Sequence, residues 1–298
     1  MYDIEALYEA ENPAHAVELL HEHPEAEIIA GGSDVLIEIR SGKSAGCTLV
    51  SIQKLDELRG ISINSEGALR IGAMTSISHV ASDSLILKHL SVLAEAAETI
   101  GSPQLRNIAT IGGNVCNGVT SADTASTLMA FDAEMEYLGR EGKRLIPIKE
   151  HYLAAGKTAL AHGEILTAII IPKMSFENCF GHYIKYAMRE ALDIATLGCS
   201  ANVRLSGDGK TIERLRLAYG VAGPVPMRSP SAEAAAEGRP IGEESINAAA
   251  EAVAADIKPR TSWRASAEFR LHLAGELARR TIRESIRMAA EAKSGGAK

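Results

Sequence analysis

The first sixty residues combine helical periodicity with short apolar runs, which predicts a small unit of helices and parallel strands. Asn12 and Pro13 are a typical helix start, with the asparagine as cap and the proline in the first turn. A strand is predicted over 27–30, an apolar-periodic helix over 35–39 and a second strand over 48–52. This spacing is that of a strand–helix–strand unit, in which the two strands run parallel.

From Ile61 the pattern changes to alternation around tight turns. The segments 61–63 and 69–71 predict a β-hairpin, and a helix with one apolar face then runs as far as Gly101-Ser102-Pro103. A glycine-rich loop is expected over 110–118. The other elements predicted before Pro172 are a helix over 123–131 and strands over 133–138, 145–148 and 164–171.

Beyond Pro172, strands come first and helices follow. Strands are predicted over 181–187, 198–205 and 211–219, and helices over 243–257 and 266–292. Strands and helices that are segregated along the chain in this way are typical of an α+β domain.

Composition and charge exclude several classes of protein. The chain has 298 residues and a net charge of −7, whereas proteins that bind nucleic acid or membrane surfaces carry basic patches. The amino terminus is acidic where a signal peptide is basic, and no apolar run approaches the roughly 18 residues of a membrane span. We therefore expect a cytoplasmic protein that contacts neither nucleic acid nor membrane.

The sequence offers no self-contained catalytic or metal site. None of its four cysteines forms a C-x-x-C pair, so any iron–sulfur cluster would lie on another chain. Two strings, Ser41-Gly42-Lys43-Ser44 and Ala155-Gly156-Lys157-Thr158, imitate a phosphate-binding loop but lack its first glycine. A G-x-G-x-x-G fingerprint, a metal-ligand cluster and a nucleophile beside a base are all missing. If this protein does chemistry, a cofactor carries it and no side chain is catalytic.

Two segments share an apolar residue, two glycines and a small polar side chain: Ala30-Gly31-Gly32-Ser33 and Ile111-Gly112-Gly113-Asn114. Glycines permit positive φ and close approach, so the amides of such a segment can converge on an anion. Each segment alone is more simply a tight turn, but two on different lobes can hold a diphosphate between them. Asp34 is unsuited to touch a phosphate and is expected to bind a hydroxyl or to cap the following helix.

These segments resemble a known family. Ala30 to Leu36 resembles the first flavin loop of FAD subunits in the xanthine dehydrogenase and carbon monoxide dehydrogenase family, and Leu105 to Asn114 is similar to the second. Ser121-Ala122-Asp123 follows at the family's spacing. Further matches are Glu164-Ile165-Leu166, Lys185 to Arg189 with Asp193-Ile194-Ala195, and Arg260 to Ser266. The resemblance covers about residues 1 to 280, and its last motif favours the stand-alone flavin subunits of bacterial xanthine dehydrogenases.

The resemblance implies an α+β fold. It consists of a two-lobed FAD-binding fold of the vanillyl-alcohol oxidase (PCMH) type, with lobes over 1–60 and 61–175, and an α+β carboxy-terminal domain over 178–298.

It also implies which residues bind FAD. Asp123 would bond the sugar–phosphate or adenosine half, Leu166 would pack on the flavin, and Lys185 would face its ring system. The complete implied set is Ile28, Ile29, Ala30, Gly31, Gly32, Ser33, Asp34, Val35, Thr110, Ile111, Gly112, Gly113, Asn114, Asp123, Ile165, Leu166 and Lys185.

The implied partners are a molybdenum-cofactor subunit and an iron–sulfur (2Fe-2S) subunit of the same complex, with NAD as electron acceptor. One departure concerns NAD, because Ile100 stands where some relatives place an aromatic ring against the flavin. Two alternatives stay open at this point. The chain could serve a related hydroxylase of the carbon monoxide, nicotinate or aromatic-CoA type, or it could be a flavin-free scaffold. Asn107 and Arg106 are expected to support the second loop.

Overall fold

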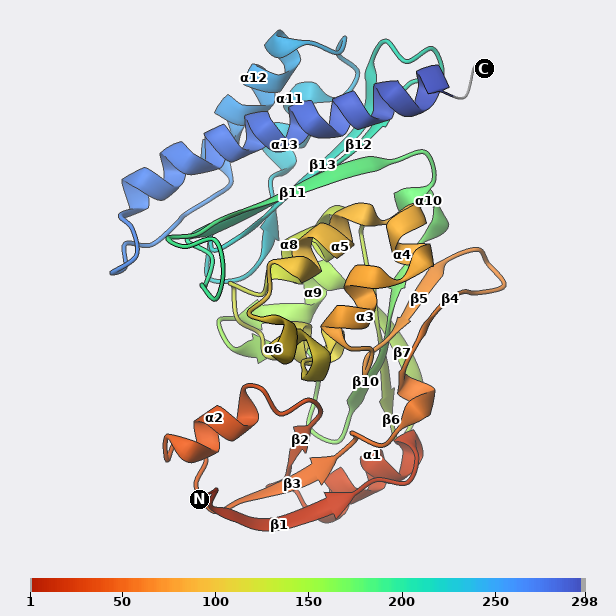
Figure 1. Cartoon of the computed structure of the whole chain (residues 1–298), viewed down its shortest axis with the longest axis vertical. Coiled ribbons are helices and arrows are strands. Elements are labelled where there is room, and N and C mark those ends of the chain that lie inside the picture. Colours follow the sequence, from red (N-terminus) through yellow and green to blue (C-terminus); the bar gives the residue numbers. More distant parts are fainter. Residues whose placement is uncertain (1, 296–298) are drawn as a thin grey trace.

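The computed structural model describes residues 2–295, and these form three parts stacked along the long axis (Figure 1). The amino-terminal part holds a parallel sheet in the order β1 (Ile4–Glu9), β3 (Cys47–Ser51), β2 (Glu27–Ile29). It also contains α1 (Pro13–Glu22) and α2 (Val35–Arg40). The predicted strand–helix–strand unit is β2–α2–β3, and its strands are parallel as expected.

The start of α1 follows its sequence signal. Asn12 accepts a hydrogen bond from the His15 amide at 2.9 Å, and Pro13 is the first helical residue. Strand β1 was not predicted, because its outward positions hold two glutamates beside Leu7 and leave no apolar run. Its inward side chains are half-buried, and Tyr8 among them packs against the amino-terminal core.

The middle part is built on an antiparallel sheet. Its order is β4 (Ile61–Ile63), β5 (Leu69–Gly72), β10 (Ile165–Ile171), β6 (Glu134–Gly139), β7 (Gly142–Pro147). Its helices are α3 (Ile77–Ser82), α4 (Ser84–His89), α5 (Ser91–Glu98), α6 (Pro103–Ile108), α7 (Ile111–Cys116), α8 (Asp123–Ala130), α9 (Ile148–His151) and α10 (Lys173–Phe176). Short pieces complete it: β8 (Tyr152–Ala154), β9 (Lys157–Thr158) and a 3-10 turn at Asp56–Leu58.

The carboxy-terminal part is an antiparallel sheet covered on both faces. Its strands are β11 (Phe180–Tyr186), β12 (Leu197–Leu205), β13 (Ile212–Gly220) and β14 (Met227–Arg228). Its helices are α11 (Pro230–Ala236), α12 (Glu243–Ala252) and α13 (Ala267–Gly295), with a 3-10 turn at Val253–Ala255. Figure 1 shows α13 lying along the outer face of this sheet, while α5 and α8 of the middle part contact the inner face.

Buried polar contacts fix the middle part to the carboxy-terminal sheet. The side-chain amide of Asn202, fully buried on β12, donates to the carbonyl oxygens of Ala130 at 3.1 Å and Ser175 at 2.9 Å. Hydrogen bonds buried in this way are costly to break, so the two parts are expected to move as one body.

Two sequence predictions need correction. Most of the expected loop over 110–118 is helical, because α7 occupies 111–116. The predicted helix end at Pro103 is also a helix start, since Pro103 is the first residue of α6 and Ser102 caps it. By contrast, the string at 41–44 is a turn as predicted, with positive φ at Gly42. In the string at 155–158 only Ala155 and Gly156 form the turn, and Lys157 and Thr158 are strand β9. Within residues 2–295, no helix is long and apolar enough to cross a membrane.

Candidate functional site

The first glycine segment links β2 to α2 and carries a row of free amides. Gly32 has a φ of 73°, which a glycine adopts without strain. Among the described residues, the five successive amides from Gly31 to Val35 donate no hydrogen bond. The run lies in a turn and at the start of α2, where amides have no backbone partner, and converging free amides of this kind are suited to receive an anionic or carbonyl oxygen.

The second glycine segment differs from the first. Three of its amides are already bonded, with Ile111 donating to Thr75 O, Gly112 to Ala73 O and Asn114 to Thr110 O. The Gly113 amide donates to the Thr110 hydroxyl at 3.1 Å, which makes Thr110 the cap of α7. The symmetric pair of glycine loops expected from the sequence is therefore wrong in form. The reason is that tertiary contacts stabilise a short helix despite its two glycines.

The glycines of these segments serve different purposes. A Cβ on Gly31 would lie 2.0 Å from the Ile108 carbonyl oxygen, and one on Gly112 would lie 2.6 Å from the Ala73 carbonyl oxygen. Both glycines are therefore required by close backbone packing. Gly113 is exposed, and a Cβ there would meet only the Thr110 hydroxyl, at 3.1 Å. Only Gly113 leaves open space for a ligand beside the second segment.

The two segments lie against each other. The Gly31–Ile108 approach joins them directly, and the Asn117 side-chain amide donates to the Asp34 carboxylate. Asp34 occupies the cap position of α2, but its side chain makes no cap bond, so the expectation that it caps the helix is wrong. Its carboxylate instead accepts the hydrogen bond from the Asn117 side chain. The segments thus form one continuous surface between the amino-terminal and middle parts.

Side chains on α7 and α8 extend this surface toward β11. The Thr124 hydroxyl donates to Asn114 Oδ1 at 2.6 Å, which leaves the Asn114 NH2 group as a donor. One position earlier, Asp123 Oδ2 receives Lys185 Nζ at 2.8 Å and Asp123 Oδ1 receives the Tyr183 hydroxyl at 3.0 Å. Lys185 also donates to the Thr99 carbonyl oxygen at 3.0 Å.

The Asp123–Lys185 ion pair is almost sealed from solvent. The side chains of Lys185 and Asp123 are 8% and 10% exposed. Burial raises the pKa of Asp123, while the charge and hydrogen bond of Lys185 and the bond from Tyr183 oppose this rise. The structure therefore brings two of the predicted cofactor residues together as each other's partner. Lys185 is not the solvated strand lysine that its type alone suggests.

The apolar members of the predicted set belong to two cores. Leu166 is 4% exposed and packs in the middle core, while Ile165 is fully buried in the amino-terminal core beside Met74. Strand β10 thus begins where the two parts meet. Ile28, Ile29 and Ala30 are half-buried on or beside β2 and lead directly into the first segment.

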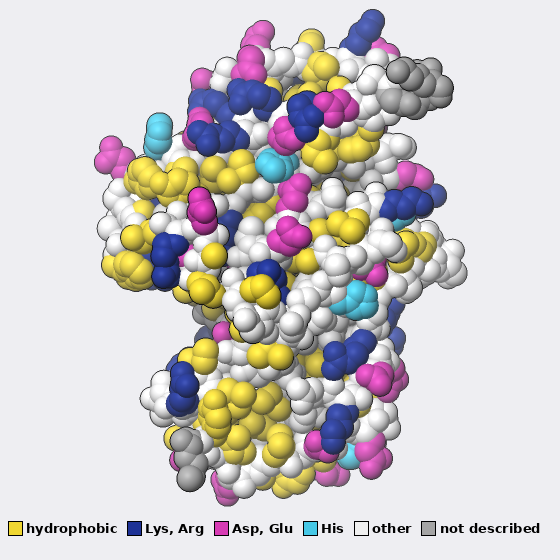
Figure 2. Space-filling view, in the orientation of Figure 1, with side chains coloured by type: hydrophobic (Ala, Val, Ile, Leu, Met, Phe, Trp, Pro, Cys, Tyr) yellow, Lys and Arg dark blue, Asp and Glu magenta, His cyan; other side chains and the backbone are white. Residues whose placement is uncertain are grey.

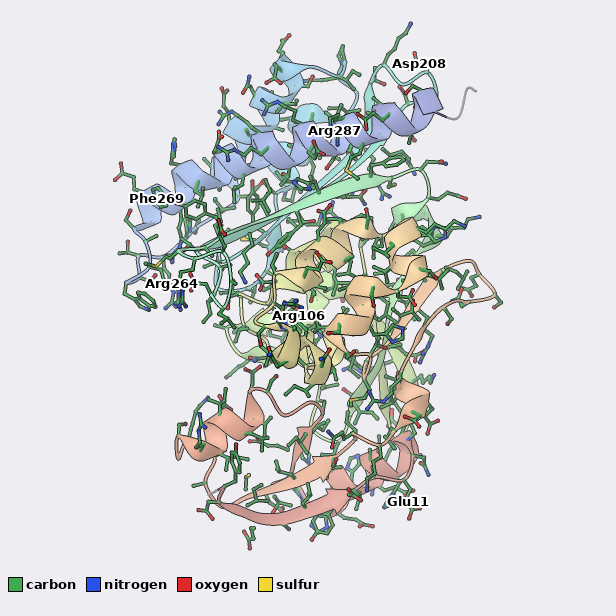
Figure 3. All side chains as sticks on the ribbon, in the orientation of Figure 1. Glu11, Arg106, Asp208, Arg264, Phe269 and Arg287 are labelled. Atoms are coloured by element: carbon green, nitrogen blue, oxygen red, sulfur yellow. The ribbon has the colours of Figure 1, made fainter. Side chains whose placement is uncertain are left out.

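Arg106 and Asn107 hold helix α6, which precedes the second segment, in place. The Arg106 guanidinium donates to the Ile100 carbonyl oxygen at 2.9 Å, and the Ser78 hydroxyl donates to Asn107 Oδ1 at 2.6 Å. Figure 3 shows Arg106 beside α6, in the centre of the molecule. Ile100 itself is a core residue.

Sequence reasoning missed Tyr183 and Asn117. Tyr183 stands two positions before Lys185 on the same strand, so the alternation of β11 places both on one face. That spacing was a usable signal. Asn117 has no comparable signal, because its partner Asp34 is far away along the chain.

A hollow of about 280 Å³ opens beside Lys185. It is lined by Thr99, Lys185 and the loop that follows β11, over 186–191, with Asp193. It therefore adjoins the Lys185 end of the site.

Comparisons with known proteins agree over nearly the whole chain. Residues 2–174 match the FAD binding domain in molybdopterin dehydrogenase, and residues 182–285 match the CO dehydrogenase flavoprotein C-terminal domain. The chain is 42% identical to the xanthine dehydrogenase FAD-binding subunit of Escherichia coli O157:H7, over 96% of this chain and 97% of that one. It is 30% identical to the carbon monoxide dehydrogenase medium chain of Hydrogenophaga pseudoflava, over 87% and 88%.

A solved structure shows the same fold. A chain of the carbon monoxide dehydrogenase from Hydrogenophaga pseudoflava superposes with a TM-score of 0.90 at 29% identity, over 97% of this chain and 99% of that one.

Proposed function

This chain belongs to the family of FAD-binding domains in molybdopterin dehydrogenases, and we propose that it holds FAD on its two glycine segments as the electron-transferring subunit of a xanthine dehydrogenase-like complex. The family and the α+β fold predicted from the sequence motifs are confirmed by the matches. The residues that hold the cofactor, its electron donor and its acceptor are the proposed part.

The free amides of the first segment are the observation that carries the proposal. A diphosphate is held well by several backbone N–H groups, and five adjacent ones from Gly31 to Val35 lack a partner among the described residues. Basic side chains are not required for this chemistry. Asp34, turned toward Asn117, leaves those amides uncovered.

The second segment is proposed to add side-chain donors. The Asn114 NH2 group is free to donate, because its oxygen is occupied by Thr124. Gly113 is exposed and lets a ligand reach the α7 backbone without steric conflict. These features fit FAD, whose diphosphate needs donors from two sides.

Asp123 and Lys185 are proposed to define the opposite end of the site. When bound, FAD supplies the chemistry of accepting and passing on two electrons. The Lys185 ammonium stabilises negative charge placed near it, and Asp123 keeps that ammonium fixed. Leu166, on β10 of the middle sheet, is proposed to present an apolar side to the ring system.

We further propose that electrons enter from an iron–sulfur subunit, that a molybdenum subunit oxidises a purine, and that NAD is the acceptor. The greater identity to a xanthine dehydrogenase subunit, 42% against 30% for a carbon monoxide dehydrogenase chain, supports the purine. All four cysteines are free thiols, which fits the cytoplasm.

The FAD site is tested by replacing Gly113 with alanine. Alanine is the better helix former, but its Cβ would lie 3.1 Å from the Thr110 hydroxyl that caps α7, so Gly113→Ala should change the free energy of unfolding of the FAD-free chain by at most ~1 kcal/mol in either direction. Its methyl group would fill the proposed cradle and should weaken FAD binding about tenfold, or by ~1.4 kcal/mol. Calorimetric titration with FAD measures the affinity, and Gly207→Ala, in an open turn, is the control. Equal affinity in both variants would refute the placement of FAD at this segment.

The acceptor is tested on the FAD-loaded chain without oxygen. NADH should reduce the bound flavin, and the reduction is measured as a loss of the flavin's visible absorbance. Bleaching by dithionite but not by NADH would show that NAD is not the acceptor, while leaving the FAD site intact.

A further inference from the structure

Exposed apolar side chains gather at one end of the carboxy-terminal part. Trp263, the only tryptophan of the sequence, is 76% exposed. The others are exposed members of the loop after β11 and of the start of α13. We call this set the docking face: Tyr186, Met188, Leu192, Ile194, Trp263 and Phe269. In Figure 2, hydrophobic side chains lie together over the end of the molecule where α13 begins.

The docking face is one surface made from two chain segments. The rings of Tyr186 and Phe269 meet edge to face, with their centres 5.9 Å apart. The Arg270 guanidinium donates to the Thr196 carbonyl oxygen at 3.1 Å, and Arg270 is only 2% exposed. The Thr196 amide in turn donates to the Tyr186 carbonyl oxygen at 2.8 Å. The two segments are therefore fixed to each other, and the apolar side chains stand on a defined support.

Cations outnumber carboxylates around this face, although its two segments also carry the exposed Glu190 and Glu268. Within the part of the chain that the structure describes, the cations Lys258, Arg260, Arg264 and Arg270 have no carboxylate oxygen within 4.0 Å. All bonds from Arg270 go to neutral oxygens, and burial together with the charges of Arg260 and Arg264 lowers its pKa. Arg264 lies over the Trp263 ring, 4.2 Å from its centre, and Figure 3 shows it at the edge of the molecule. The chain as a whole has a net charge of −7, so an excess of cations at this end is an exception.

We propose that the docking face binds an acidic, partly apolar surface of another subunit of the hydroxylase complex. This inference rests on the proposed function, because it assumes that assembly. Exposed aromatic rings beside arginines are typical of the central contacts of protein interfaces. The face begins at Tyr186, directly after Lys185, so a subunit bound here would adjoin the Lys185 end of the proposed FAD site.

A second copy of this chain fits the face poorly. In a symmetric dimer this face would meet a copy of itself, so its excess of cations would meet the same excess, which is unfavourable. A partner with acidic residues would neutralise them and would also cover the apolar side chains. Charge complementarity therefore selects a different protein.

Two methionines allow a direct test by oxidative footprinting. Met188 in the docking face is 63% exposed and Met174 outside it is 65% exposed, so the free chain should oxidise both at similar rates. The complex is purified at native levels through a tag on this chain, exposed to hydroxyl radicals, and analysed by mass spectrometry. We expect Met188 and Trp263 to oxidise several-fold more slowly in the complex than in the free chain. Unchanged rates at both residues would overturn the proposal.

A variant provides the second measurement. The double substitution Trp263→Ala with Arg264→Glu should reduce the partner subunits recovered with the tagged chain by about tenfold, because it removes the aromatic contact and reverses a charge. The control Leu153→Ala removes a 66% exposed side chain elsewhere and should leave recovery unchanged. Equal recovery from both variants would contradict the proposal. A double variant that keeps its partner subunits but no longer self-associates would contradict it too. Failure of the unaltered chain to retain any molybdenum or iron–sulfur subunit would instead contradict the proposed function.

Discussion

Replacing Lys185 with methionine tests whether the Asp123–Lys185 pair is held by the fold itself. Methionine keeps the length of the side chain but removes the ammonium, which leaves the Asp123 carboxylate buried with only the Tyr183 hydroxyl as partner. Removing one member of a buried ion pair costs about 3–5 kcal/mol, because the remaining charge is no longer compensated. We therefore expect Lys185→Met to lower the free energy of unfolding by ~3–5 kcal/mol at neutral pH.

Urea denaturation of the FAD-free chain, followed by circular dichroism, measures this loss. The matched control is Lys173→Met, which breaks a 3.1 Å pair with Glu177 whose two side chains are each 53% exposed, and it should cost at most ~1 kcal/mol. The double variant Asp123→Asn with Lys185→Met removes the stranded charge and should recover much of the stability. A loss below ~1 kcal/mol in Lys185→Met, or a double variant no more stable than the single one, would refute this reasoning.

The pH dependence of Lys185→Met gives an independent check. Burial raises the pKa of Asp123, and in the variant the ammonium no longer opposes this rise. The folded state then binds a proton more readily than the unfolded state, whose aspartate titrates near ~3.9. The stability deficit should be full at neutral pH and should shrink as the pH falls through the raised pKa of Asp123. A deficit that is constant with pH would mean that it comes from lost packing and not from the carboxylate.

Two further predictions concern the two closely packed glycines and the hydrogen bond between His182 and Glu95. Gly31→Ala and Gly112→Ala should each lower the free energy of unfolding by ~1–3 kcal/mol in urea titrations, because their methyl groups would overlap backbone oxygens, whereas Gly207→Ala should change it little. The hydrogen bond between His182 Nδ1 and Glu95 raises the pKa of His182, so its contribution to stability is present below ~6.5 and lost as the pH rises through the raised pKa. His182→Gln should therefore destabilise the chain more at about pH 5.5 than at about pH 8.5, and an equal effect at both would contradict this.

The sequence predicted those parts of the fold that depend on local alternation and capping. Strand β10 follows from a continuous apolar run and the β4–β5 hairpin from alternation around a turn, and α1 begins where Asn12 and Pro13 place it. The parallel arrangement of β2 and β3 follows from the helix between them. These features need no knowledge of distant residues.

The rest depended on contacts between residues far apart in the chain. Helix α7 forms although glycines disfavour helices, because Thr110 caps it and Gly112 packs against Ala73. Asp34 has the residue type of a helix cap, but Asn117 binds its carboxylate instead. No local pattern in the sequence indicates either outcome.

The asymmetry of the two glycine segments decides which substitutions are informative about FAD. Because Gly31 and Gly112 approach backbone oxygens, their substitution disturbs the fold and the site together, and loss of FAD in those variants cannot be assigned to the ligand. Gly113 is exposed, and a Cβ there would meet only the Thr110 hydroxyl, so a change in affinity without a change in the stability of the FAD-free chain reports on the ligand. The amides of the first segment make the same distinction, since they lack protein partners and their exchange with deuterium should slow when FAD binds. If the first segment binds FAD through its amides, exchange at 31–35 should slow when FAD binds. Exchange at the amides of α7 that are already bonded should stay unchanged.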